Sequence, residues 1–259
     1  GRKEGVVIAL PAPEPEIQPY HLEDADVETS SEGYALRFSG EVGRYFLEVQ
    51  AAAALEVLAP FPGARVLDVG GGHAQLAGPL IEQGFDVTVV GSREVCRERL
   101  DRNLPPGSFQ FRACDLLDLP FEDRSFDVVI AFRLIAHVPR WRELIAGMCR
   151  VARKAVVLDY SDARSFNVLY SALFPWKRAL EGNTRSFFCF RSGQVAAELA
   201  EHGFVGPLVR RQFFVPMVVH RKLRSAGFSR TVERASKTLG LTRAFGSPVV
   251  LRAERKEVE

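Results

Sequence analysis

Five short apolar runs separated by helical patterns constrain the fold of this chain most strongly. The runs are nearly unbroken and mostly β-branched or aromatic, which is typical of strands that are covered on both faces. They lie at 65–69, 86–90, 109–113, 126–132 and 155–160, with helix candidates between them at about 74–83, 93–103 and 140–152. Because strands and helices alternate, we expect an α/β fold with a doubly wound, mostly parallel sheet and right-handed crossovers.

The segments on either side of this core have a different character. Residues 1–33 are rich in proline and acidic residues and have no sustained apolar period, so we expect a flexible N-terminal arm. Folded structure is expected to begin near Tyr34, and an amphipathic helix should follow and end before Pro60. We expect residues 34–259 to form a single domain.

The last hundred residues complete the expected sheet and add two insertions. Strand candidates at 206–215 and 247–253 bring the sheet to seven strands, and a helix is expected at about 191–202. Helical insertions at about 161–190 and 216–245 interrupt this part of the chain. Long insertions late in such folds usually lie over the carboxyl ends of the strands, where ligands bind.

Composition excludes several classes of protein. The 259 residues are 47% hydrophobic and 25% charged, which are ordinary values for a globular protein. The four cysteines are far apart and form no C-x-x-C pair, and the histidines lack ligand spacing, so we expect no metal site and a reduced, cytoplasmic protein. No apolar run approaches the ~18 residues of a membrane span, and no signal core is visible.

The glycine cluster after the first strand narrows the choice of ligand. A strand that ends in glycines and opens a helix brings bare backbone N–H groups close to a ligand, and the chain here reads "VLDVGGGHAQLA". A P-loop would need G-K-[ST], and the dinucleotide pattern G-x-G-x-x-G fails at Gln75. Asp68, just before the glycines, would repel a pyrophosphate and suits a cationic ligand.

The segment "VLDVGGGHA" resembles motif I, [DE]-x-G-x-G-x-G, of class I S-adenosylmethionine-dependent methyltransferases. Asp68, Gly70 and Gly72 match three of the four marked positions, and Ala74 replaces the last glycine, at a position expected in the first helical turn where only smallness is required. The segment "FRACDLLDLPFEDRSFDVVIAFRLIAHVPRWREL" resembles the ubiquinone-biosynthesis-like (methyltransferase type 11) branch of this family, which acts on small molecules. The resemblance spans about residues 34–160 and implies a Rossmann-like methyltransferase sheet.

The resemblance also implies a set of residues that bind S-adenosylmethionine. Asp115 would accept from the adenine amino group, the backbone N–H of Leu116 would meet the ring, and Phe132 would lie by the methionine part. The remaining expected cofactor-binding positions are the motif I aspartate, the three glycines and the end of the second strand: Asp68, Gly70, Gly71, Gly72, Gly91 and Ser92.

The clearest departure from the family lies at Gly91. Family members usually carry an acid there that binds both ribose hydroxyls. Losing such a charge-assisted contact costs on the order of 1.5–3 kcal/mol of binding free energy unless another group replaces it. The Ser92 hydroxyl, Glu94 or a water could do so in part. A non-catalytic interaction module that kept the fold is therefore an alternative hypothesis.

No catalytic residue is assigned from the sequence. Methyl transfer requires mainly that the acceptor be aligned with the methyl carbon, and a general base is needed only for some acceptors. His137 is a candidate base, although a structural role is favoured; Asp159 and Tyr160 are weaker candidates. His73 is expected to cap the helix or border the cofactor.

The substrate is inferred from the C-terminal third. From Arg210 to Arg252 there are ten Lys or Arg residues and one acid, Glu233. Aromatic residues among these cations suit a flat or lipophilic small-molecule acceptor with an anionic group. RNA methylation is an alternative, but no RNA-binding module is visible, so nucleic acid is not expected. The sequence specifies no oligomeric state.

One apolar stripe in this region allows a further partner. Phe228, Val232, Ala235 and Leu239 recur at helical spacing between basic residues and could contact an anionic membrane surface. Packing of the stripe against the sheet is the favoured interpretation.

Overall fold

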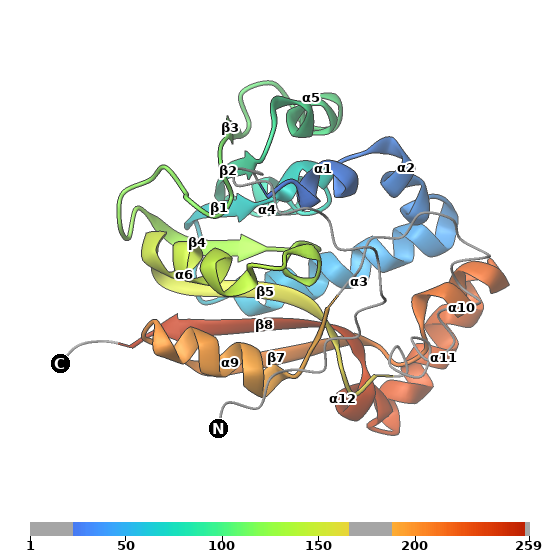
Figure 1. Ribbon diagram of the computed structural model, residues 1–259. Coiled ribbons are helices and arrows are strands. Elements are labelled where there is room, and N and C mark those ends of the chain that lie inside the picture. The colour runs from blue at the N-terminus through green and yellow to red at the C-terminus, as the bar shows by residue number, and fades with distance from the viewer. Residues whose placement is uncertain (1–22, 166–187, 257–259) are drawn as a thin grey trace, which may run out of the picture.

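The computed structural model describes residues 23–165 and 188–256, which share one twisted, mostly parallel sheet (Figure 1). The strand order is β3-β2-β1-β4-β5-β8-β7, and β6 (Cys189–Phe190) pairs beside this path with β5. The seven strands on the path are β1 (Arg65–Val69), β2 (Asp86–Gly91), β3 (Gln110–Ala113), β4 (Phe126–Ala131), β5 (Ala152–Asp162), β7 (Phe204–Phe213) and β8 (Ser247–Arg255). The first five are parallel, and β8 runs antiparallel to both β5 and β7. The predicted doubly wound, mostly parallel sheet is confirmed.

Helices cover both faces of the sheet, which explains why the central strands are mostly apolar. On one face lie α6 (Trp141–Val151) and α9 (Ser192–Glu201), which bury Trp141, Leu144, Val195 and Leu199. On the other lie α3 (Gly40–Leu58), α4 (Ala77–Glu82) and α5 (Glu98–Asn103), which bury Val57, Leu80 and Leu100. No helix among the described residues is long and apolar enough to cross a bilayer.

Ordered structure begins earlier than the sequence predicts. Helices α1 (Ala25–Thr29) and α2 (Glu32–Ala35) precede η1 (Leu36–Phe38), and Ser31 caps α2 by accepting from the Tyr34 N–H at 3.2 Å. The predicted flexible arm is therefore wrong for residues 25–33, because α1 buries Ala25 and Asp26 against the rest of the molecule. The remainder of that arm, residues 1–22, lies outside the described residues.

The second predicted insertion forms three α-helices near the end of β7. They are α10 (Met217–Leu223), α11 (Ala226–Thr238) and α12 (Leu241–Phe245). Of the first insertion, the middle, residues 166–187, lies outside the described residues.

The predicted packing of the α11 apolar stripe on the sheet is wrong. Phe228 is 51% and Leu239 73% exposed, and the buried face of α11 carries Ser229, Glu233 and Ser236 instead. Glu233 explains why this face of α11 is buried, because its carboxylate accepts from the backbone N–H groups of Phe214 and Val215, each at 2.9 Å. A buried carboxylate that satisfies two strand-end N–H groups fixes which face of α11 turns inward.

Candidate functional site

The three glycines form a tight turn at the carboxyl end of β1. Gly70 adopts a left-handed conformation with φ 73°, and its N–H donates to the Val90 carbonyl at 2.8 Å. Gly71, Gly72 and His73 then form the short helix η2, and all three glycines are buried. A Cβ at Gly71 would collide with the Asp68 carboxylate, so the loop lies directly on that side chain. This contact explains why glycine is needed at the middle position.

Ala74 departs from the sequence expectation. It was expected in the first helical turn, but α4 begins only at Ala77, and Ala74 has φ 55°. This left-handed conformation costs an L-residue roughly 1–2 kcal/mol, which glycine avoids. Ala74 is thus a strained substitution for glycine, and smallness is not the only requirement at this position.

Asp68 is a fully buried carboxyl group without a hydrogen-bond partner. Neither carboxylate oxygen accepts a bond from any described residue. Burial, and to a smaller extent the neighbouring Asp159, raise the pKa of Asp68 to about 7. An orphaned buried acceptor is costly, and a cationic donor at this place would satisfy it. The expectation that Asp68 suits a cationic ligand therefore matches its environment.

A second carboxylate, Asp26 of α1, lies where the β2 strand lacks its acid. The fully buried Asp26 accepts from the Ser92 N–H at 2.8 Å and from the Ser92 hydroxyl at 2.5 Å. A Cβ at Gly91 would stand 3.2 Å from Asp26 Oδ2 and 2.7 Å from the Cys96 Cβ. A carboxylate from α1 thus lies beside position 91, and glycine there leaves it room.

The sequence reasoning missed Asp26 because it placed this residue in a flexible arm. It named Ser92, Glu94 or a water as replacements for the absent acid, and Ser92 instead anchors the replacement. The missing acid at Gly91 indicates that an acid elsewhere in the chain replaces it, and the acidic stretch "HLEDADVETSS" offers candidates.

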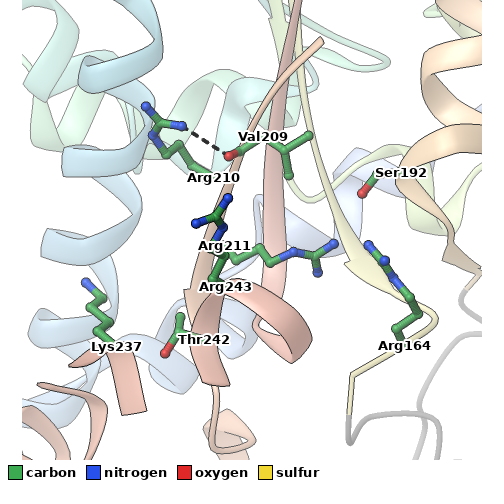
Figure 2. Close-up of a pocket in the computed structure, with 8 residues that line it drawn as sticks. All are labelled: Arg164, Ser192, Val209, Arg210, Arg211, Lys237, Thr242 and Arg243. Atoms are coloured by element: carbon green, nitrogen blue, oxygen red, sulfur yellow. Dashed lines mark hydrogen bonds between the residues drawn. The ribbon is translucent and has the colours of Figure 1, made fainter. Parts of the chain in front are cut away.

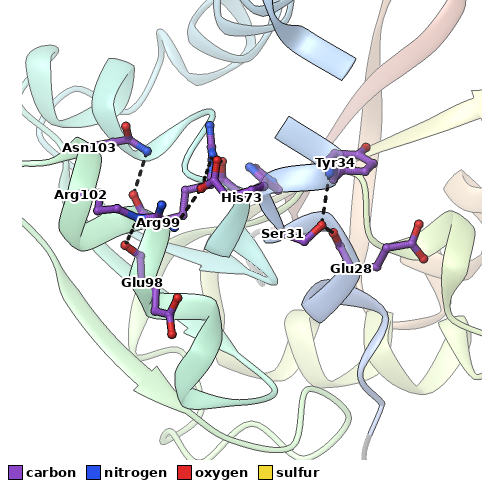
Figure 3. Close-up of polar contacts among 9 residues, drawn as sticks. Glu28, Ser31, Tyr34, His73, Glu98, Arg99, Arg102 and Asn103 are labelled. Atoms are coloured by element: carbon purple, nitrogen blue, oxygen red, sulfur yellow. Dashed lines mark hydrogen bonds and ion pairs between the residues drawn. The ribbon is translucent and has the colours of Figure 1, made fainter. Parts of the chain in front are cut away.

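Further contacts hold α1 and α2 against the glycine loop. The Arg99 Nε atom donates to the His73 carbonyl at 3.1 Å, a contact drawn in Figure 3, and its Nη1 atom pairs with Glu32 at 3.0 Å. Arg102 pairs with the same carboxylate at 2.8 Å. A Cβ at Gly72 would collide with the Ser30 hydroxyl, so the segment after α1 packs directly on the loop. The N-terminal helices therefore form one wall of the site.

The other predicted cofactor residues gather at the same edge of the sheet. Asp115 follows β3 and accepts from the Leu117 N–H at 2.9 Å, and Leu116 between them is fully buried. Phe132 directly follows β4 and is buried with the cluster that packs under α3 and α4. Parallel strands bring their carboxyl ends to one edge, where Asp68 and Gly91 lie in the last residues of β1 and β2, and Asp115 and Phe132 follow β3 and β4.

A polar network behind the loop centres on Arg133, which sequence reasoning did not single out. Arg133 Nε donates to Gln75 Oε1 at 3.1 Å, its guanidinium also bonds Gln50, and its backbone N–H donates to Asp159. The Arg133 Cζ atom lies 4.5 Å from the Phe38 ring centroid, which ties the network to the N-terminal segment. Arg133 has φ 57°, a conformation that strains a non-glycine residue and that this network holds in place.

The candidate general bases lie in environments of different kinds. Asp159 is buried and bonded to the Arg133 N–H, and burial raises its pKa. Tyr160 is buried in the core beside Phe190, and its pKa is likewise raised by burial. His137 is partly exposed and lies in η4 (Ile135–His137), which begins four residues after the end of β4. Asp159 and Tyr160 are therefore both buried, whereas His137 is partly exposed.

His73 does not cap α4, whose N-cap residue is Leu76, but bonds within the loop before it. Its Nδ1 atom accepts from the Gln75 N–H at 3.1 Å, and burial lowers its pKa to about 3, which keeps the ring neutral. Across the described parts of the chain, no three His, Cys, Asp or Glu side chains stand close enough to share a metal ion.

Comparison with known proteins agrees with this geometry. A family model described as a methyltransferase domain matches residues 67–158, the segment from β1 to β5. This segment is therefore similar to a methyltransferase domain. Among solved structures, magnesium protoporphyrin IX methyltransferase from Synechocystis, determined with bound SAH, shares the fold at a TM-score of 0.60 and 17% identity. That match covers 89% of this chain and 98% of the other.

Curated relatives of the methyltransferase domain carry related descriptions. The O-methyltransferase cnsE of Penicillium expansum is 36% identical over 110 residues, which are 40% of each chain. The fatty-acid O-methyltransferase of Mycolicibacterium smegmatis is 32% identical over 139 residues, 51% of this chain and 48% of that one. A phthiotriol/phenolphthiotriol dimycocerosates methyltransferase of Mycobacterium ulcerans is 33% identical over 128 residues, 47% of this chain and 44% of that one. The chain thus spans less than half the length of these relatives.

Proposed function

We propose that this protein transfers a methyl group from S-adenosylmethionine to a small lipophilic acceptor. The observation that carries the proposal is the pair of buried carboxylates at the glycine loop. Asp68 has no partner of its own, and Asp26 stands beside the glycine that replaces the family's ribose-binding acid. A sulfonium cofactor with an ammonium group and a ribose diol offers donors to both.

Each side chain would hold a different part of the cofactor. Asp68 suits the ammonium of the methionine part, Asp26 the ribose hydroxyls, and Asp115 with the Leu116 N–H the adenine. When bound, the cofactor supplies a methyl carbon activated by the adjacent sulfonium. The protein aligns the acceptor and excludes water, and α1, α2 and the Arg133 network close the site on the side of the glycine loop.

The acceptor class is inferred from the names of the relatives. Two relatives are named for fatty-acid and phthiotriol substrates, which are lipophilic.

The four free thiols Cys96, Cys114, Cys149 and Cys189 favour a reducing, cytoplasmic location. The alternative of a non-catalytic module rests on the missing acid at Gly91 alone. The Asp26 carboxylate beside that position makes this alternative less well supported.

Calorimetric titration with S-adenosylmethionine tests the proposal. We expect saturable binding in the micromolar range for the unmodified protein and weaker binding for Asp68→Asn. Incubation with long-chain alcohols and phenols, followed by mass spectrometry, should then reveal a methylated product and S-adenosylhomocysteine. Absence of cofactor binding at millimolar concentration would refute the proposal.

A further inference from the structure

A strongly basic pocket lies at the same edge of the sheet as the glycine loop, four strands away. It has a volume of about 460 Å³, and Figure 2 shows Arg164 and Ser192 on one side and Lys237 on the other. Its lining residues are Arg164, Ser192, Val209, Arg210, Arg211, Lys237, Thr242 and Arg243. They come from the end of β5, the start of α9, β7, α11 and α12, so the fold assembles the pocket from distant segments.

The cationic side chains of this pocket exceed the acids that face them. Arg211 pairs with the buried Asp162 at 2.6 Å, and Arg164 approaches the same carboxylate at 3.5 Å. Arg210 pairs with Glu56 at 2.7 Å. Two carboxylates thus face five cations, and among the described residues neither Lys237 nor Arg243 has an ion-pair partner. This excess of positive charge in a concave site attracts a polyvalent anion.

Neutral groups in the pocket also suit an anion. Thr242 is 3% exposed, and its hydroxyl finds no hydrogen-bond partner among the described residues. Ser192 opens the ten-residue helix α9, where the first backbone N–H groups have no helical acceptor. A hydroxyl donor and a helix start beside several guanidinium groups match the several oxygens of a phosphate.

The register of the sheet relates this pocket to the glycine loop. Arg211 and Tyr160 both pair with Val249, so Arg211 is level with the end of β5. Asp68 pairs with Ile130, which pairs with Val157, so Arg211 stands three residues, or about 10 Å, farther along the strands toward the same edge of the sheet. From β1 to β7 there are four strand spacings of about 4.8 Å, which is roughly 19 Å.

We propose that this pocket binds a phosphate group carried at the far end of an elongated acceptor, whose other end reaches the methyl donor. The assignment of the ligand as acceptor rests on the proposed function, whereas the phosphate site rests on the pocket alone. Leu239 and Phe245 flank the pocket residues Lys237, Thr242 and Arg243 along the chain and are 73% and 44% exposed. Apolar side chains beside an anion site suit an amphipathic molecule.

Phosphate binding by matched variants tests the site. Calorimetry of the full chain with inorganic phosphate and with dodecyl phosphate is compared between Lys237→Ala/Arg243→Ala and Lys222→Ala/Arg234→Ala. Both double variants remove two exposed positive charges, but Lys222 and Arg234 do not line the pocket. We expect the pocket variant to weaken both ligands about tenfold or more, since it removes two charge-assisted contacts, and the control to change binding less than about twofold.

Three further outcomes separate the hypotheses. Equal weakening by both double variants would mean diffuse surface charge and would overturn the proposal. Retention of S-adenosylmethionine binding with no phosphate binding would overturn the anion site alone, and the converse would refute only the proposed methyltransferase function. Co-sedimentation with phosphatidylglycerol vesicles but not phosphatidylcholine vesicles, lost in the pocket variant, would identify a lipid headgroup as the phosphate source and supports the site.

Discussion

Replacing Asp26 by asparagine tests whether a carboxylate from the N-terminal segment completes the cofactor site. The substitution keeps the size of the side chain and one oxygen acceptor, and it removes the negative charge. Ser92 donates two hydrogen bonds to this carboxylate, from its N–H and its hydroxyl. Asparagine can accept from one donor with its carbonyl oxygen, but its amide group faces the other donor.

The expected loss follows from the contacts of the carboxylate. A hydrogen bond to a charged acceptor contributes about 1.5–3 kcal/mol, and a neutral one about 0.5–1.5 kcal/mol. Exchanging the charged acceptor for a neutral one at the ribose therefore costs roughly 1–2 kcal/mol of binding free energy, or about 5- to 30-fold in Kd. The free energy of unfolding should fall by a similar amount, because Asp26 is fully buried and anchors Ser92.

The assay compares two ligands so that binding and folding effects separate. Calorimetry measures the Kd of S-adenosylhomocysteine and of its 2′-deoxy analogue for the unmodified protein and for Asp26→Asn. We expect the substitution to weaken the parent ligand clearly more than the analogue, which has lost one ribose donor. Asp24→Asn is the matched control, because Asp24 is two residues away and its ion pair with Arg93, at 3.8 Å, lies on the surface.

Two results would refute the reasoning. If Asp26→Asn weakened both ligands equally, Asp26 would act only by holding α1 in place. If it left both affinities unchanged while urea unfolding showed the expected loss of stability, the N-terminal carboxylate would have no part in the cofactor site. Urea unfolding also shows whether the variant remains folded under the conditions of the titration.

Three other substitutions test the glycine loop. Ala74→Gly should raise the free energy of unfolding by up to about 1 kcal/mol, because relief of the left-handed strain exceeds the entropy that glycine loses on folding; a decrease would contradict the strain. Gly71→Ala should lower it by about 1–3 kcal/mol through collision with Asp68, again by urea unfolding, and an unchanged midpoint would contradict the close contact. The raised pKa of Asp68, about 7, means that the folded protein holds a proton that the unfolded chain releases near pH 4. Stability should therefore fall as pH rises from about 4 to about 7, by at most about 1.4 kcal/mol per unit, and Asp68→Asn should flatten this slope.

The core of the fold could be predicted from the sequence because its strands carry their own signal. Runs such as 65–69 and 126–132 are mostly apolar, apart from Arg65, Asp68 and Asp127, as is typical of strands covered on both faces, and α6 shows its buried residues at three- and four-residue steps. The boundaries of α4 could not be predicted, since the left-handed turn at Ala74 delays the helix to Ala77. The spacing of apolar residues in the sequence does not indicate that an alanine adopts a left-handed backbone conformation.

The N-terminal wall of the site was missed for a different reason. The segment from Glu23 to Ser31 is polar and has no apolar period, so local patterns indicate an arm. Its order comes from tertiary contacts, chiefly Asp26 with Ser92 and Glu32 with Arg99. Such contacts depend on residues more than sixty positions apart, and no window along the chain reveals them.

The face of α11 shows how a single buried acid can override an apolar pattern. Phe228, Val232, Ala235 and Leu239 form the most hydrophobic stripe of the helix, and packing of that stripe was the favoured expectation. Glu233 accepts two backbone N–H groups and contacts His220, and leaving those donors unpaired would cost free energy comparable to that of exposing Phe228 and Leu239. The helix therefore turns its polar side inward and leaves apolar side chains exposed near the basic pocket.

The separation of the two sites restricts the acceptor more than the family likeness does. In fatty-acid O-methylation the anionic group is itself the methyl acceptor, so its carboxylate must stand at the methyl donor. Here the excess positive charge stands roughly 19 Å from β1, and the donor edge instead holds the carboxylates Asp26, Asp68 and Asp115. Those acids would repel an anionic acceptor atom, whereas the cations of the pocket would attract it. A neutral hydroxyl at one end and a phosphate at the other therefore match the charge distribution better than a free fatty acid does.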